Sequence, residues 1–208
     1  MTNQTINERP QRRWWILVLA VMIIATIAVP VSILAYKERA AVKIMKMGGN
    51  IDVNDAPQGA DLMTMGGDVT VERVNSFAKV KTMGGDIHIR QADAAVDATT
   101  MAGNIDVEIT GDSGAHHDID LSSNQGNITL TVPKGFPMQV SVSLATTNNQ
   151  SKTFRIIDNI GLTQQADSNW DSSKGTPRKY LRATGRTGSG LNRVTLSTIN
   201  GDVILQQR

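Results

Sequence analysis

The sequence contains no cysteine, which excludes disulfides, thiolate metal sites and cysteine nucleophiles. Aromatic residues make up only 4% of its 208 residues, although aromatic rings usually contribute much of a compact core. The formal net charge is only +2, which argues against a dedicated nucleic-acid-binding protein. We therefore expect a narrow core of aliphatic side chains and no nucleic-acid partner.

Known catalytic motifs are also missing. The sequence has no G-x-S-x-G elbow, no P-loop and no H-E-x-x-H pair. Polysaccharide lyases and hydrolases are the main enzymatic alternative for a β-repeat protein, but they use longer coils, wide clefts and aromatic sugar platforms. The aromatic residues after position 36 are too few for such platforms. We expect no enzyme, no catalytic residue, no cofactor and no bound metal.

One long run of uncharged residues stands near the N-terminus. It covers residues 14–36 and reads WWILVLAVMIIATIAVPVSILAY. About 20 apolar residues suffice to cross the hydrocarbon core of a bilayer. Trp14, Trp15 and Tyr36 lie at its ends, where aromatic rings favour the membrane interface. The sequence thus predicts a short tail over 1–13 and a transmembrane α-helix over 14–36.

A cleaved signal peptide is the alternative to an uncleaved anchor. Its apolar region is usually about 7–15 residues long and ends in small residues. The present run is longer, and its best cleavage site places the bulky Ile33 where a small residue is needed. Basic residues flank both ends almost equally. Arg12 and Arg13 directly before the helix favour a cytoplasmic N-terminus, with the rest of the chain periplasmic or extracellular and anchored once in the inner membrane.

Four copies of one motif follow, each starting 18 residues after the last. They read MGGNIDV at 47–53, MGGDVTV at 65–71, MGGDIHI at 83–89 and MAGNIDV at 101–107. A fixed period of this kind indicates a repeat architecture. Within each copy, glycine followed by Asn or Asp is typical of a tight turn, and the next three residues alternate as in a half-buried strand.

The rest of each period aligns as well. Aliphatic side chains recur at two positions in the other half of each period, and these side chains are expected to point inward, with the polar side chains between them pointing outward. Each coil then has two short arms and two turns, with coils stacked ~4.8 Å apart. The methionines that open the copies are interpreted as packing residues. A hexapeptide β-helix is excluded, because stepping by six from Val69 meets the polar Asn75 and Lys81.

Later copies are less regular. A fifth copy covers 124–130 and a last one 197–205, which closes the chain. Between them, residues 161–190 are polar and are expected to form an irregular loop or a decorated edge. The predicted fold is therefore all-β: a single β-solenoid of stacked 18-residue coils over 37–208, preceded by the transmembrane helix.

These copies support a family resemblance. GGNIDV, GGDVTV, GGDIHI and the closing LSTINGDVIL resemble the putative-adhesin family of bacterial β-strand-repeat proteins, over about residues 41–208. The resemblance implies a β-repeat fold, and members of the family are found largely in bacteria and are mostly of unknown function. It supplies no catalytic residues, because the family has none that are agreed.

Several residues are candidates for structural or binding roles. Asp68 and Asp86 should stack on neighbouring coils, where they either share a cation or serve as ordinary turn residues, and we favour turns. His116 and His117 lie near carboxylates and either bind zinc or are solvated, and we favour solvation. The structural turn glycines are Gly49, Gly67, Gly85, Gly103, Gly126 and Gly201. A basic cluster, either a solvated loop or a patch for an anionic partner, comprises Lys174, Arg178, Lys179, Arg182 and Arg186.

Taken together, the sequence predicts a membrane-anchored binding, adhesion or scaffolding module without catalysis. The expected partners are the lipid bilayer through 14–36, a second copy through the edge of the solenoid, and an envelope protein or polysaccharide. The alternative is an envelope-stress or signalling accessory protein that senses a ligand and acts through a membrane partner.

Overall fold

The computed structural model describes residues 40–111, 116–173 and 175–208. Residues Ala40–Arg208 cluster as one compact unit, and every regular element described in it is a strand. The predicted tail and transmembrane helix, 1–13 and 14–36, lie outside the described residues. Within the described part of the chain, no helix has the length and apolar character to cross a membrane. The all-β prediction is confirmed for this part.

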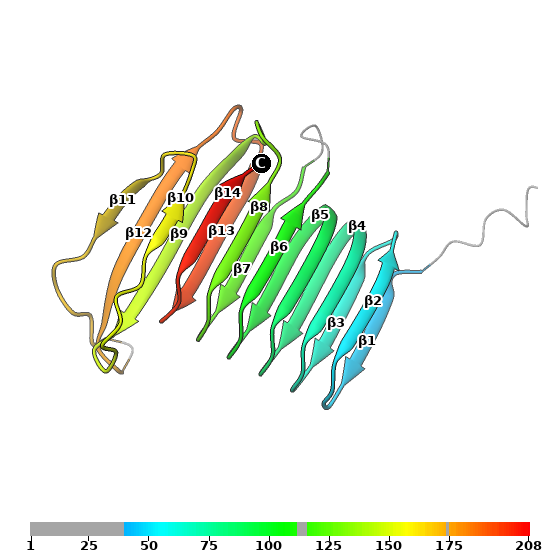
Figure 1. Ribbon diagram of the computed structural model, residues 1–208, viewed down its shortest axis with the longest axis horizontal. Coiled ribbons are helices and arrows are strands. Elements are labelled where there is room, and N and C mark those ends of the chain that lie inside the picture. Colours follow the sequence, from blue (N-terminus) through cyan, green and yellow to red (C-terminus); the bar gives the residue numbers. More distant parts are fainter. Residues whose placement is uncertain (1–39, 112–115, 174) are drawn as a thin grey trace, which may run out of the picture. The chain divides into compact units, whose positions relative to one another are not determined.

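The first eight strands are β1 (Val42–Lys46), β2 (Ile51–Ala56), β3 (Ala60–Thr64), β4 (Val69–Thr82), β5 (Ile87–Thr100), β6 (Ile105–Ile109), β7 (Ile119–Ser123) and β8 (Ile128–Val132). The remaining six are β9 (Met138–Thr147), β10 (Ile156–Asp158), β11 (Thr163–Ala166), β12 (Arg178–Arg186), β13 (Asn192–Ile199) and β14 (Val203–Gln207). Up to β8 the strands follow one another along the repeat, and β13 and β14 then lie before β9 in the stack (Figure 1).

Parallel pairing arranges these strands in two rows. One row runs β1-β3-β4-β5-β7-β13-β9, and the other β2-β4-β5-β6-β8-β14-β10. β4 and β5 belong to both rows because each continues through a corner. The register matches the sequence period, since Val69 pairs with Ile51 on one side and with Ile87 on the other. The result is one strongly curled, solenoid-like sheet.

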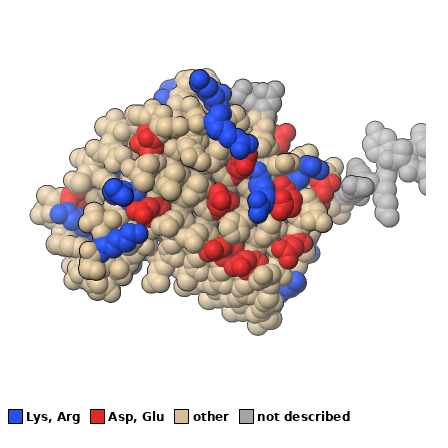
Figure 2. All heavy atoms as spheres, viewed as in Figure 1, with Lys and Arg blue, Asp and Glu red and all other residues tan. Residues whose placement is uncertain are grey.

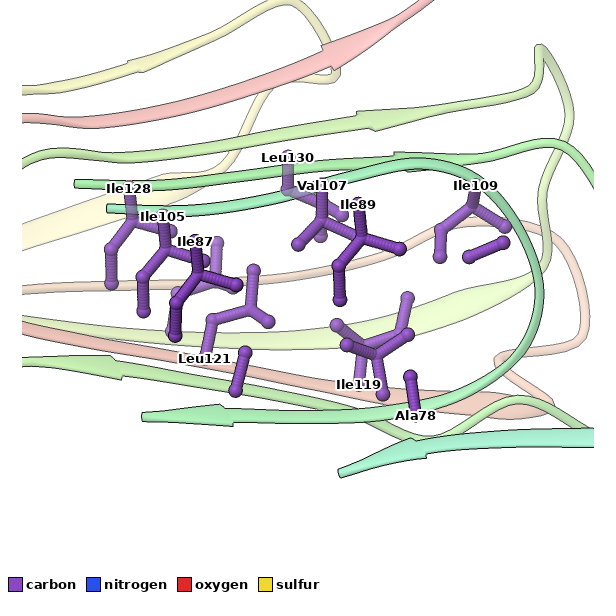
Figure 3. Packing of buried hydrophobic residues seen from close by; sticks show 14 of the residues in the cluster. Ala78, Ile87, Ile89, Ile105, Val107, Ile109, Ile119, Leu121, Ile128 and Leu130 are labelled. Carbon is purple, nitrogen blue, oxygen red and sulfur yellow. The ribbon is translucent and has the colours of Figure 1, made fainter. Parts of the chain in front are cut away.

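The core lies between the two rows. Figure 3 shows Ile87, Ile105 and Ile128 stacked as one ladder, with a second ladder of aliphatic side chains beside it. Ile119 and Leu121 of β7 face them from the other row. All five side chains are almost fully buried. Because burial of one aliphatic side chain contributes about 1.5–3 kcal/mol, these ladders replace the missing aromatic core.

The last copy does not close the stack. β13 and β14 lie between the coil of β7 and β8 and the coil of β9 and β10, pairing in parallel with both. After β8 the chain therefore leaves one coil position empty, and its own C-terminal segment fills that position. The order of stacking differs here from the order of the sequence.

The segment 161–190 is only partly loop. It contains β11 and β12, which pair antiparallel with each other, and β12 pairs antiparallel with β9. Leu181 and Ala183 pack against the core, so alternate residues of β12 face inward and outward. The polar composition of this segment predicts a loop. The segment nevertheless contains the strand β12, because only one face of that strand contacts the core and needs apolar side chains.

Candidate interaction surface

The turn glycines form a column in which neighbouring coils touch. Gly67, Gly85, Gly103 and Gly126 all have φ values between 122° and 154°. A Cβ on any of them would overlap the carbonyl group of the glycine one coil before. Gly49 begins the column and meets no neighbour, although its φ is 83°. Glycine is therefore required at the other four positions by both conformation and close approach, and at Gly49 by conformation alone.

Gly201 deviates from the predicted turn. The residue with positive φ in its copy is Asn200, at 56°, and Gly201 does not share that conformation. A Cβ on Gly201 would still overlap the carbonyl of Gly126. The residue is thus needed for close approach, and the positive φ of this turn lies at Asn200 instead.

Polar side chains beside this column bind the coils together. The side-chain oxygen of Asn50 accepts from the backbone N–H of Asp68 at 2.9 Å, and that of Asp68 accepts from Asp86 at 2.8 Å. The same pattern continues upward to Asp202. Asp68 and Asp86 therefore act as turn acceptors. Among the described residues, no group of three His, Asp or Glu side chains could hold a metal ion.

The two adjacent histidines point to different surroundings. His117 is buried, and its Nε2 lies 3.1 Å from an Asp93 carboxylate oxygen. His116 is exposed, with its Nε2 3.7 Å from Asp118. They therefore do not share one ligand position. The burial of the His117 side chain contradicts the prediction that it is solvated. The backbone N–H of His117 also donates to the side-chain oxygen of the buried Asn192 at 2.6 Å, which anchors this segment.

The predicted basic cluster is divided by the alternation of β12. Arg178, Arg182 and Arg186 fall on the outward-facing positions and Lys179 on an inward-facing one, while Lys174 lies outside the described residues. Arg182 contacts the Asp167 carboxylate at 2.6 Å and lies 4.9 Å from the centre of the Tyr180 ring. Arg182 is thus already neutralised, which leaves Arg186 as the more available cation.

An open groove beside Arg186 was missed by the sequence reasoning. Its volume is about 610 Å³, and Arg193 of β13 lines it together with Arg186. Ser141, Thr184 and Thr195 supply hydroxyl groups to the same groove. No sequence spacing reveals this set, because β13 reaches β9 only through the insertion of the C-terminal copy. We call these five residues the arginine groove.

A second hollow of about 410 Å³ is more acidic. Asp97, Asp118 and Asp120 line it, together with the two basic residues Lys79 and Arg193. Asp97 and Asp120 are direct neighbours on β5 and β7. Partial burial raises the pKa of the Asp120 carboxyl, and the negative charge of Asp97 raises it further. Acidic side chains thus lie side by side on β5 and β7, next to Arg193 of β13.

Neither sign dominates the face shown in Figure 2, where basic side chains lie beside acidic ones. The described residues include exposed ion pairs, such as Arg90 with Glu72 at 3.1 Å. Exposed pairs of this kind contribute only about 0–1 kcal/mol each. A uniform basic footprint for nucleic acid is thus absent from this face.

The methionine column also differs from its prediction. Met65, Met83 and Met101 are 46%, 47% and 48% exposed, and Met47 is 85% exposed. The interpretation of these side chains as packing residues is therefore wrong. The chain turns in the residues directly after each methionine, so the side chains project from the corner of the stack into solvent.

Comparison with known families agrees with this architecture. Residues 39–164, more than half of the chain, match the family model described as Toastrack DUF4097. The chain belongs to this family, and the resemblance to a β-strand-repeat family of unknown function is confirmed. No curated protein matches the sequence.

A solved structure also matches the chain. It is the crystal structure of a putative cell adhesion protein from Clostridium sporogenes ATCC 15579. The two chains share 10% sequence identity with a TM-score of 0.41, over 81% of this chain and 94% of that one.

Proposed function

We propose that this chain is a single-pass membrane protein whose β-solenoid lies outside the cytoplasm and binds an anionic envelope polysaccharide without catalysis. The observation that carries the proposal is the arginine groove, an open, hydroxyl-lined surface fixed by three neighbouring strands. The resemblance to the putative-adhesin family supports a binding or adhesion module. The apolar run 14–36 supports the anchor.

The chemistry of the groove fits an extended acidic sugar chain. Arginine pairs with carboxylate or phosphate groups through two parallel hydrogen bonds. Ser141, Thr184 and Thr195 both donate and accept, as sugar hydroxyls require. Arg186 now donates to the backbone carbonyl of Ser189, and Arg193 lies 3.7 Å from Asp118. Both contacts are exposed, so a ligand would displace them at small cost.

Binding of acidic envelope polysaccharide to the full-length chain tests the groove. The double variant R186A/R193A should bind about tenfold more weakly or worse, since a hydrogen bond to a charged group contributes about 1.5–3 kcal/mol and exposure reduces that value. The control R73A/R90A removes the same charge from the other row. Equal weakening in both variants would show unspecific charge attraction and contradict a groove-specific site.

Topology is tested separately with a C-terminal tag and added protease. Loss of the tag on intact cells indicates surface exposure and adhesion. Loss only in spheroplasts indicates a periplasmic scaffold or sensor. A tag protected in both preparations would reverse the proposed orientation.

A further inference from the structure

A second exposed cluster lies at the N-terminal end of the stack, away from the arginine groove. Met45-Lys46-Met47 and Met63-Thr64-Met65 repeat the pattern Met-x-Met on consecutive coils. Met45 is 67% exposed, Met63 39%, and the other two methionines 85% and 46%. Because these four apolar side chains are largely or partly exposed, burial does not explain why methionine occupies these positions. Another property of methionine, its thioether sulfur, is the better explanation.

The strand register brings the first methionine of each pair together. β1 pairs in parallel with β3, and Met45 lies opposite Met63. Met47 and Met65 follow two residues later, one residue beyond the ends of β1 and β3, where the chain turns. Neighbouring strands are ~4.8 Å apart. Because a methionine side chain has three rotatable bonds, the four sulfur atoms are able to approach a common point.

The residues between the methionines hold this arrangement. Thr64 is buried, and its hydroxyl donates to the carbonyl of Gly49 at 3.1 Å, which turns the flanking Met63 and Met65 outward. The Lys46 ammonium donates to the carbonyl of Asn50 at 2.7 Å. The Lys46 charge is therefore held at the following turn, while Lys81 lies opposite Met63 on the next strand, β4.

The chemistry of the donor set points to one class of metal. Thioether sulfur is a soft, uncharged ligand that selects Cu(I) over harder ions such as zinc, magnesium and calcium. We propose that Met45, Met47, Met63 and Met65 form a surface site for Cu(I), or for Ag(I) as its redox-inert analogue. Thioethers carry no proton that competes with the metal, so binding is independent of pH, unlike binding by thiolate or imidazole.

The same column supplies an internal control. Met83 and Met101 continue it, but the residues two positions earlier are Lys81 and Thr99. These coils offer one thioether each instead of two. Exchange of methionine for leucine keeps an apolar side chain and removes the sulfur, so it separates metal binding from docking of an apolar partner.

The test uses the full-length chain in mild non-ionic detergent. Cu(I) is titrated without oxygen against a chromogenic Cu(I) chelator, and Ag(I) by calorimetry. We expect one equivalent of either ion on the original chain, with the same affinity at pH 5.5 and pH 7.5. M63L/M65L should bind at least 30-fold more weakly, and M83L/M101L should bind as the original chain does. Far-UV circular dichroism checks that both variants are folded.

Methionine methyl resonances provide a second readout. Added Ag(I) should shift the signals of the four proposed ligands and leave those of Met83 and Met138 in place. Three results would overturn the site: no binding by the original chain, equal weakening in both double variants, or shifts at other methionines. Unchanged binding in M63L/M65L would equally refute it and favour an apolar docking ridge.

Discussion

The glycine column makes the sharpest prediction about stability. In G85A the new Cβ would overlap the carbonyl group of Gly67, at a residue whose φ is 150°. A side chain in such an unusual conformation costs about 1–3 kcal/mol. Relief of the overlap moves the backbone and weakens two hydrogen bonds, Gly85 N–H to Ala102 at 2.9 Å and the Thr100 hydroxyl to Gly85 at 3.1 Å. Each contributes about 1 kcal/mol. The total expected loss is ~3–5 kcal/mol.

The adjacent glycine is the matched control. A Cβ on Gly84 meets nothing within 4 Å, and the fourth copy already carries alanine at this position, as Ala102. G84A should therefore change the free energy of unfolding by no more than about 0.5 kcal/mol. G49A should fall between the two, because Gly49 has a positive φ of 83° but no close neighbour.

Urea unfolding followed by far-UV circular dichroism measures these differences. For an m-value of about 2 kcal/mol/M, a loss of 4 kcal/mol lowers the midpoint by about 2 M. The expected order of midpoints is G84A, then G49A, then G85A as the least stable. If G85A and G84A unfold at the same urea concentration, the close approach of coils at this column is not what fixes glycine there.

Three further predictions concern the ladders, the acidic hollow and the last coil. D86A removes an acceptor for the next coil and should lower the free energy of unfolding by about 1 kcal/mol in the same urea assay, whereas D52A on the outer face should change it by less than half of that. Folding raises the pKa of Asp120 above its ordinary value of 3.8, so the folded state binds its proton more tightly and stability falls as pH rises from that value through the raised pKa. Unfolding midpoints measured across this range should lose part of that slope in D120N and also in D97N, and an unchanged slope in both variants would contradict the assignment. Deletion of residues 192–208 removes the coil between two others, and should abolish cooperative unfolding of the part that follows β8.

The local design of the coil could be predicted from the sequence. The period of 18, the inward aliphatic ladder and the stacking of Asp68 and Asp86 all follow from short-range rules of turn and strand. These rules act within one coil or between consecutive coils, so a repeated pattern in the sequence is enough to specify them. The resemblance to a β-repeat family rested on the same signal.

Other features depend on contacts between distant segments. Spacing does not determine that the copy at 197–205 enters the stack beside β8, because every coil presents the same unpaired backbone edge and several neighbours would satisfy it. That insertion brings Arg193 to Arg186 and creates the arginine groove. The exposure of the methionines likewise depends on the tertiary structure, because they lie at a corner of the stack that faces solvent. Short-range patterns are therefore enough to specify a single coil, whereas contacts between distant segments specify which coils are neighbours and which side chains remain on the surface.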